Sequence, residues 1–437
     1  MDWLMPLVII IGGFLVLMFM GMPIAFAFIM INVGGALLIW GGVPGMMQLI
    51  LSIYESVTSF TIMPIIYFSL LGEVMFISGI APRMIDAISK TLGRLPGRLS
   101  LVTVAGAALL STMSGASIGT TALLGDVFLP EMEKRGYKKP MTLGPILGSG
   151  GLAMMIPPTG LGILLAALAQ VSVGRFLIAI FIPGILLAVF YGAYVIIRCI
   201  LQPDLTPTLD TVGLSIVEKI KLNFKYVLPM GLIIFLVLGL IFLGIATPSQ
   251  SAAMGVIGAV FLAAVYKGLS LAMLKKAVKS TVLISGMVLI IMSAASAFSQ
   301  LLAFTGASRG LIAAALQLSV DPLFIIVIML IVALIMGTFM NPVSIMMITI
   351  PIYMPIVNRL GFDGIWFSAM LLLVMEMGQS TPPFGILLFV MKGVAPPGTS
   401  MMDIYKAGLP FLGCDLALLA LMLFLPPIVL WLPAFMN

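Results

Sequence analysis

The sequence predicts an all-α polytopic membrane protein built from two inverted-topology repeats, each with spanning helices, a re-entrant helical hairpin and a helix broken by glycine and proline. Three observations lead to this fold class. Hydrophobic residues make up 62% of the chain, charged residues only 8%, and mean hydropathy is +1.27, far from the balance of a soluble domain. Similar apolar segments recur in the same order in both halves of the chain. Several of them are interrupted by Gly and Pro where hydrophobicity is highest.

Ordinary spanning helices account for eight long apolar runs, because about 20 apolar residues cross the hydrocarbon core. The runs are Trp3–Met20, Pro23–Trp40, Phe60–Ile80, Phe176–Ile197, Tyr226–Ile245, Ser249–Tyr266, Val282–Phe304 and Leu409–Trp431. The weaker segment Pro44–Thr58 carries Gln48, Tyr54 and Glu55. It predicts an amphipathic arm at the interface, residues 44–58, with a polar loop as the alternative. Residues 1–80 would thus hold the first scaffold helices.

The remaining apolar segments come in pairs that are too short or too interrupted to cross the membrane alone. We predict re-entrant hairpins at 99–130 and 322–356 and broken helices at 141–170 and 364–391. In hydrocarbon an unpaired backbone group costs several kcal/mol, so a broken helix persists only where protein or a watery cavity satisfies the freed groups.

Duplication explains the recurring interruptions. The segment Ser78–Ala87 resembles Thr305–Ala314 at an offset of 227, and Pro157-Pro158 lies 225 residues before Pro382-Pro383. Both proline pairs are followed by the sequence GILL. Chance similarity is common between two apolar segments, but several pairs in one order favour two repeats. We place them at residues 1–201 and 226–437, joined by a polar, cytoplasmic linker at 202–225.

Charge predicts the orientation. If the paired segments are hairpins that enter and leave on one side, each repeat has an odd number of crossings and the copies are inverted. Of the 21 basic residues, all except Arg175, Arg309 and Arg359 then fall on one face. The positive-inside rule makes that face cytoplasmic and both termini periplasmic in a bacterial inner membrane. The net charge of +6 follows from this orientation and gives no evidence for a nucleic-acid partner.

Inverted repeats with broken helices at matching positions are typical of secondary transporters whose site lies near the membrane midplane. At the first break, the carbonyls of Ala153, Ile156 and Pro158 can turn toward a cation. A new half-helix begins after Thr159, whose hydroxyl can cap it and whose free N–H groups favour an anion. The sequence therefore predicts cation sites beside a site for an anionic substrate.

The hairpin tips and the second break offer the same chemical groups, so each copy would build one cation site. Candidate sodium ligands are Ser114, Ala116, Ala153, Ile156, Pro158, Asn341, Val343, Gly378, Thr381 and Pro383. Candidate substrate-binding residues are Ser114, Gly115, Ser117, Thr159, Asn341, Ser344 and Ser380. The structural alternative is that the proline pairs are simple kinks and the hydroxyls bind backbone carbonyls.

Four motifs also resemble a known family. They are SGASIGTTALLGDVFLPEMEKRGY (Ser114–Tyr137), GSGGLAMMIPPT (Gly148–Thr159), IPGILLA (Ile182–Ala188) and EMGQSTPPFGILLFV (Glu376–Val390). Together they closely resemble the large membrane subunit of the tripartite ATP-independent periplasmic (TRAP) transporters, over nearly the whole chain.

The resemblance implies an elevator-type transporter, similar to the ion transporter superfamily, with two or more transported sodium ions. Its substrate would be a small organic acid of the C4-dicarboxylate, sialic acid or other sugar-acid class. The implied partners are a periplasmic substrate-binding protein and a small four-helix membrane subunit. The sequence departs from the family pattern at Ala116, at Thr159 and at Asn341, where an acid is common and the change removes a negative charge.

Glu73 and Glu376 lie inside apolar runs, where each would cost about 2.5–3.5 kcal/mol at a helix centre. Either a carboxylate titrates in a proton-coupled cycle, or it forms hydrogen bonds that hold a broken segment. The first reading leaves a proton-coupled organic anion transporter of the same fold, without a binding protein, as the alternative function. The chain has no histidine and only two cysteines. We therefore expect no enzyme, and no cofactor other than the transported sodium ions.

Overall fold

The computed structural model describes residues 3–91, 96–114, 117–207, 215–317 and 320–436, and its regular elements in these ranges are all helices. The α-helices are α1 Leu4–Phe19, α2 Ile24–Leu38, α3 Val43–Thr58, α4 Met63–Ile77, α5 Ile80–Thr91, α6 Arg98–Ser114, α7 Ser117–Lys134, α8 Lys139–Met155, α9 Gly160–Leu168, α10 Val173–Ala179, α11 Phe181–Leu201, α12 Ile216–Tyr226, α13 Leu228–Phe242, α14 Pro248–Val265, α15 Leu271–Phe304, α16 Ala307–Gln317, α17 Pro322–Phe339, α18 Pro342–Arg359, α19 Gly364–Ser380, α20 Ile386–Val394, α21 Met401–Phe424 and α22 Pro427–Leu430.

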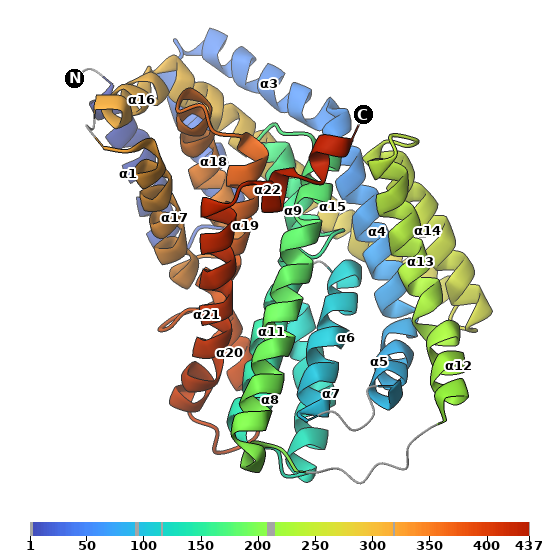
Figure 1. Cartoon of the computed structure of the whole chain (residues 1–437). Helices are drawn as coiled ribbons and strands as arrows, with labels where there is room; N and C mark the ends of the chain where they lie inside the picture. The colour runs from blue at the N-terminus through green and yellow to red at the C-terminus, as the bar shows by residue number, and fades with distance from the viewer. Residues whose placement is uncertain (1–2, 92–95, 115–116, 208–214, 318–319, 437) are drawn as a thin grey trace.

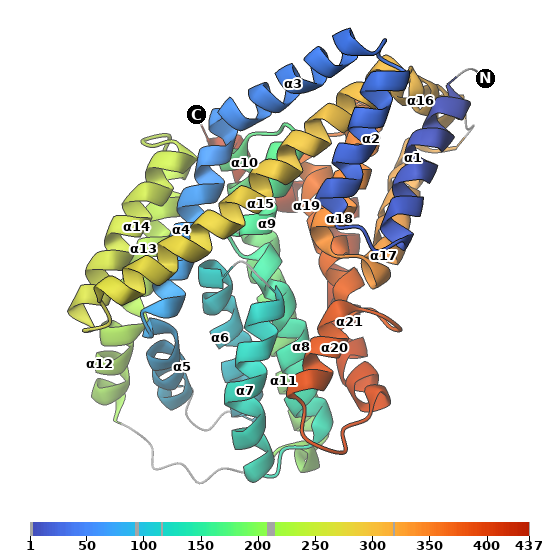
Figure 2. The ribbon, with the colours of Figure 1, turned by 180° about the vertical axis from the view of Figure 1, so that it is seen from behind.

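Two groups of helices pack side by side. In the first, which we call the scaffold, α15 packs against α2, α3 and α4, and α14 packs against α4 and α13. In the second, which we call the core, α8 packs against α6, α7, α11 and α21, while α17 packs against α19. Figure 2 shows α15 crossing the scaffold obliquely over its whole length. Helices α8 and α19 therefore lie at the centre of the core, and both are buried along nearly all of their length.

One end of the molecule carries a group of lysines. Both chain ends lie at the same end as α3 and α16, and the opposite end carries α5 and α12 (Figure 1). Helix α12 alone contributes Lys219, Lys221 and Lys225 to that opposite end. Among the described residues, five helical segments are long and apolar enough to cross a membrane, and three bent pairs raise this to eight. The chain is therefore a multi-pass membrane protein.

Helix boundaries recur along the chain. Helices α8 and α19 both have 17 residues and begin at Lys139 and Gly364, 225 positions apart. Helices α5 and α16 begin at Ile80 and Ala307, 227 positions apart. One difference stands out in the scaffold. The interval that α15 fills as one helix of 34 residues is divided between α3 and α4 in the first half, where the short turn Phe60–Ile62 intervenes.

Several boundaries differ from those predicted. The run Val282–Phe304 is only the later part of α15, because Ser270 caps the helix by accepting from the Met273 N–H at 3.1 Å and no Gly or Pro follows until Gly286. The run Phe176–Ile197 is divided between α10 and α11 at Ile180.

The expected linker at 202–225 is not merely polar. It contains most of α12, which begins with a capping box between Ser215 and Glu218. The run Leu409–Trp431 is also shifted, because α21 starts at Met401 and ends before Pro426 and Pro427, which cannot continue it.

Candidate functional site

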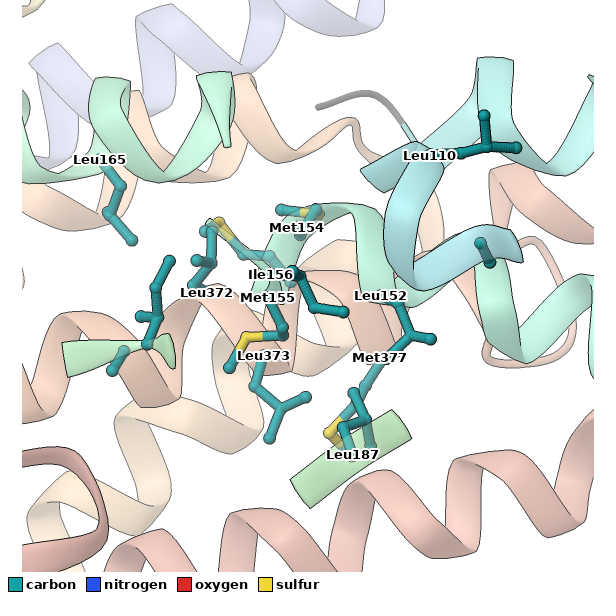
Figure 3. Close-up of a cluster of buried hydrophobic side chains, with 14 of the residues drawn as sticks. Leu110, Leu152, Met154, Met155, Ile156, Leu165, Leu187, Leu372, Leu373 and Met377 are labelled. Carbon is teal, nitrogen blue, oxygen red and sulfur yellow. The ribbon is translucent and has the colours of Figure 1, made fainter. Parts of the chain in front are cut away.

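The predicted hairpins and broken helices are neighbours in the core. Hairpin one is α6 with α7 and packs on α8; hairpin two is α17 with α18 and packs on α19. Helices α8 and α19 also contact each other. Figure 3 shows apolar side chains packed between these two helices, where Leu152 and Met155 of α8 lie beside Leu373 and Met377 of α19. All four side chains are almost fully buried, so the breaks rest on a closely packed base.

The first break lies where the sequence predicts it. Helix α8 ends at Met155, Ile156 is extended, and α9 begins at Gly160 with its axis bent by 45°. The Thr159 hydroxyl caps α9 by accepting from the Gly162 N–H at 3.4 Å. Residue 157 is a proline and has no N–H to donate to the Ala153 carbonyl, four residues earlier. The carbonyl of Ala153 is thus free of the usual helical bond and can bind another group.

The second break uses its polar groups differently. Helix α19 ends at Ser380 and α20 begins at Ile386. The hydroxyls of Ser380 and Thr381 both donate to the Met377 carbonyl, at 3.1 and 2.6 Å. The Pro383 carbonyl accepts from the Tyr405 hydroxyl at 2.8 Å, and the Gly378 carbonyl accepts from the Thr381 N–H at 3.2 Å. The predicted ligands here already have protein partners, as the structural alternative expects, although each oxygen keeps a second lone pair.

The two hairpin tips can be compared only in part. Gly115, Ala116 and the side chain of Ser114 lie outside the described residues. Ser117 opens α7 and donates to Glu376 Oε2 at 2.7 Å, so its hydroxyl bonds with α19. At the second tip, Asn341 Oδ1 caps α18 by accepting from the Ser344 N–H at 3.0 Å. Ser344 is fully buried, and its hydroxyl has no partner among the residues that the structure describes.

Glycines allow the closest contacts between these elements. A Cβ on Gly378 of α19 would lie 2.5 Å from the Cα of Gly337 of α17. A Cβ on Gly150 of α8 would lie 2.0 Å from the Thr121 hydroxyl of α7. Each hairpin therefore touches its broken helix at a glycine, and a side chain at either position would push the two apart.

A cavity of about 410 Å³ separates the core from the scaffold. From the core it is lined by Pro158 and Gly160 at the first break, by Gly119 of α7 and by Val343 of α18. The scaffold wall comes from α4 and α15 and includes Glu73, whose Oε1 accepts from the Ser280 hydroxyl at 2.7 Å. The volume falls within the range of small-molecule sites. Of the predicted site residues, Pro158 and Val343 line this cavity.

A larger cavity, of about 1200 Å³, opens between α3, α4, α14 and α15 on one side and the segment after α9 on the other. Its polar lining includes Glu55, Gln170, Ser172, Gln250 and Gln300. Helices α3 and α10 lie toward the end of the molecule that holds both chain ends (Figure 2). This cavity therefore lies toward that end of the molecule.

One buried polar pair was missed in the sequence. Asp415 of α21 is 4% exposed and accepts a hydrogen bond from the Tyr191 hydroxyl of α11. The signal was an acid inside an apolar run, the same signal that singled out Glu73 and Glu376.

Comparison with known proteins agrees with this architecture. Residues 11–428 match the model of the family described as "Tripartite ATP-independent periplasmic transporter, DctM component". The chain is 31% identical over 449 residues to the C4-dicarboxylate TRAP transporter large permease protein DctM of Rhodobacter capsulatus, covering 98% of this chain and 99% of that one.

Two further similarities extend this comparison. The chain is 29% identical to the isethionate TRAP transporter permease protein DctMQ of Oleidesulfovibrio alaskensis, covering 98% of this chain and 66% of that protein. Among solved structures, the YdaH transporter of Alcanivorax borkumensis superposes with a TM-score of 0.63 at 16% identity, over 90% of this chain and 91% of that one. At this identity the likeness concerns the fold alone.

Proposed function

We propose that this chain, which belongs to the DctM-component family of tripartite ATP-independent periplasmic transporters, takes up a small organic acid by sodium-coupled secondary active transport. The relative from Rhodobacter capsulatus is a C4-dicarboxylate permease, so a C4-dicarboxylate is the first substrate to test. Sialic acid and other sugar acids belong to the same chemical class. A proton-coupled cycle without a binding protein is the alternative.

The observation that carries this proposal is the cavity of about 410 Å³ between core and scaffold. The first break and one helix of each hairpin meet there, so an organic acid in this cavity would touch all three. The N-terminus of α9 points free N–H groups toward an anion. Behind it, the Ala153 carbonyl, which lacks its usual helical partner, and the other predicted ligands of the first break would offer oxygens to a sodium ion.

A cation site at the second hairpin has separate support. The buried hydroxyl of Ser344 has no partner in the described part of the chain, and such a group is costly unless a ligand satisfies it. Asn341 lies three residues away and keeps a second oxygen lone pair beyond its cap. Two sodium ions carried with one monovalent anion would move one net charge, worth about 2.3 kcal/mol per 100 mV. A C4-dicarboxylate would cancel this electrical drive unless a third cation moved with it.

We further propose that the two halves are inverted repeats and that the core moves against the scaffold as an elevator. Hairpin one follows α5 and hairpin two follows α16, and these short helices lie at opposite ends of the molecule (Figure 1). This supports hairpins that open to opposite sides. The basic end that carries α12 would then be cytoplasmic, and both termini would be periplasmic.

The proposed partners are a periplasmic substrate-binding protein and a small four-helix membrane subunit. The name DctMQ of the relative from Oleidesulfovibrio alaskensis, in which the match to this chain covers 66% of the length, supports a second membrane component.

The test is uptake of radiolabelled succinate and of sugar acids into proteoliposomes that contain the chain with its small subunit and binding protein. We expect uptake only with an inward sodium gradient. Uptake that ignores sodium but follows a pH gradient would replace the proposal by the proton-coupled alternative.

A matched pair of serines tests the residues. Ser344 of α18 and Ser251 of α14 are both fully buried with unpartnered hydroxyls among the described residues. Ser344→Ala should weaken sodium-dependent uptake, whereas Ser251→Ala in the scaffold should not. Equal effects of the two would argue against a ligand role for Ser344.

A further inference from the structure

A third, much smaller cavity lies inside the core and shares no lining residue with the two cavities described above. Its volume is about 10 Å³, which is room for about one water-sized occupant. Four helices meet around it, and its polar lining consists of Tyr191 of α11, Glu376 and Ser380 of α19, and Asp415 of α21. Gly151 of α8 lines it as well. Ser380, predicted to bind substrate, thus lies at this cavity and not at the larger one.

Both carboxylates at this cavity are almost fully buried, with Glu376 2% exposed and Asp415 4% exposed. Glu376 Oε2 accepts from the Ser117 hydroxyl at 2.7 Å and from the Gln379 amide at 3.1 Å. Its other oxygen, Oε1, has no hydrogen-bond partner within the described ranges. A Cβ on Gly151 would lie 3.1 Å from that oxygen, so the glycine keeps the space beside Oε1 open.

No basic side chain of the described residues lines the cavity. The other titratable groups near it are Tyr191, which donates to Asp415, and Cys414, the neighbour of Asp415 in α21. Arg198 lies about two helical turns beyond Tyr191, and Lys406 lies more than two turns before Asp415. Two buried carboxylates without a counter-charge cost several kcal/mol each. Either a proton or a bound cation would remove most of that cost, and the open space beside Glu376 Oε1 offers room for a cation.

The ligand set selects the kind of cation. Carboxylate and hydroxyl oxygens are hard ligands. The described part of the chain contains no cluster of three or more His, Cys, Asp or Glu side chains that could hold a metal ion. Magnesium keeps several waters and calcium takes six to eight oxygens, which a space for one occupant does not provide. We propose that Glu376 and Asp415 bind one small alkali-metal cation in the core, with the hydroxyl oxygens of Tyr191 and Ser380 as further ligands.

This site is additional to the cation sites proposed at the hairpins and breaks. It lies between α8, α11, α19 and α21. A cation bound there would compensate the negative charge of Glu376 and Asp415 inside the core. Its occupation joins α19 to α21 electrostatically. A cation held here would also add one positive charge to those that move with the substrate.

The test counts bound ions, so it does not depend on transport. Radioactive sodium binding to the purified full-length chain is measured by equilibrium dialysis, with choline chloride keeping the ionic strength constant. Melting temperature is followed in parallel with sodium, lithium or potassium chloride. We expect Asp415→Asn, which keeps an oxygen for Tyr191, to bind one sodium ion fewer per chain than wild type. The increase in melting temperature that sodium and lithium chloride produce should also be smaller in this variant.

A second variant keeps the test decisive if Asp415→Asn does not fold. Gly151→Ala should narrow the space beside Glu376 Oε1 and remove the same single ion, while Gly413→Ala, whose Cβ would meet no heavy atom within 4 Å, should bind the wild-type number. An unchanged sodium count in a folded Asp415→Asn or Gly151→Ala protein would overturn the site. The number of sodium ions bound per chain does not depend on whether sodium drives uptake. The cation site in the core and the proposed transport function are therefore tested separately.

Discussion

Alanine at Gly378 should force α17 and α19 apart at the level of the second break. The new Cβ would lie 2.5 Å from the Cα and 2.8 Å from the carbonyl carbon of Gly337. Neither atom belongs to a side chain that could rotate away. Ordinary contact begins near 3.4 Å, so the two backbones must separate by about 0.9 Å, the difference between 3.4 and 2.5 Å.

Overpacking of this kind costs about 1–3 kcal/mol. Alanine gains about 1 kcal/mol in helix propensity, so the net loss in the free energy of unfolding should be no more than about 2 kcal/mol. Binding is affected more directly, because Gly378 is a predicted ligand of the second cation site. If the full packing cost falls on the ion-bound state, sodium affinity drops about 5–150-fold.

The assay is the sodium concentration for half-maximal uptake in proteoliposomes, together with the melting temperature in detergent. Gly239→Ala in α13 is the control, since its Cβ would meet no heavy atom within 4 Å. We expect a raised half-maximal sodium concentration for Gly378→Ala and a wild-type value for the control. Wild-type sodium dependence in Gly378→Ala would refute the reasoning.

Three further predictions concern the hairpins. Ser117→Ala should lower stability by about 1.5–3 kcal/mol, because it removes a buried hydrogen bond to a carboxylate. In a double-mutant cycle with Glu376→Ala the losses in melting experiments should be strongly non-additive, and additive losses would mean that the contact contributes nothing. Asn341→Ala should remove the cap of α18 at a cost of about 1 kcal/mol. Asn341→Asp should keep the cap and tighten sodium binding, as dialysis would measure; weaker binding would exclude a cation near this side chain. Gly150→Leu should abolish sodium-dependent uptake while leaving the amount of protein in the membrane unchanged, because the side chain collides with Thr121. Normal uptake by this variant would speak against the first site.

Local signals in the sequence located the breaks well. Helix α17 begins at Pro322 and α9 at Gly160, the residues at which the sequence predicts these segments to start. Proline lacks an N–H and glycine leaves the helix at low cost, so the signal is carried by the residues themselves. The start of α15 was missed because Lys275 and Lys276 resemble a loop in hydropathy, although nothing in their backbone prevents a helix.

Local sequence patterns could not predict which side chains contact each other at the site. Ser117 and Glu376 are 259 positions apart, and Tyr191 and Asp415 are 224 apart. Their pairing depends on how α7, α11, α19 and α21 pack, which periodicity does not encode. The hydrogen bonds of Glu376 agree with the interpretation that it holds a broken segment. Ser380 is the clearest example of this limit of local sequence patterns. Its position next to the break predicted a contact with substrate, but its side chain lines the small cavity in the core instead of the cavity of about 410 Å³.

The unbroken helix α15 makes the protein sensitive to the thickness of its bilayer. Beyond the last of its lysines, Lys279, the helix continues for 25 residues from Ser280 to Phe304, or about 38 Å at 1.5 Å per residue. A hydrocarbon layer of about 30 Å can contain that length only if the axis leans by about 37°, near the steep limit for such helices. In thinner lipids we expect α15 to tilt further or the bilayer to thicken around it, and α2, α3 and α4, which pack against α15, would tilt with it. We therefore expect acyl-chain length to change the tilt of the scaffold helices and with it the rate of transport.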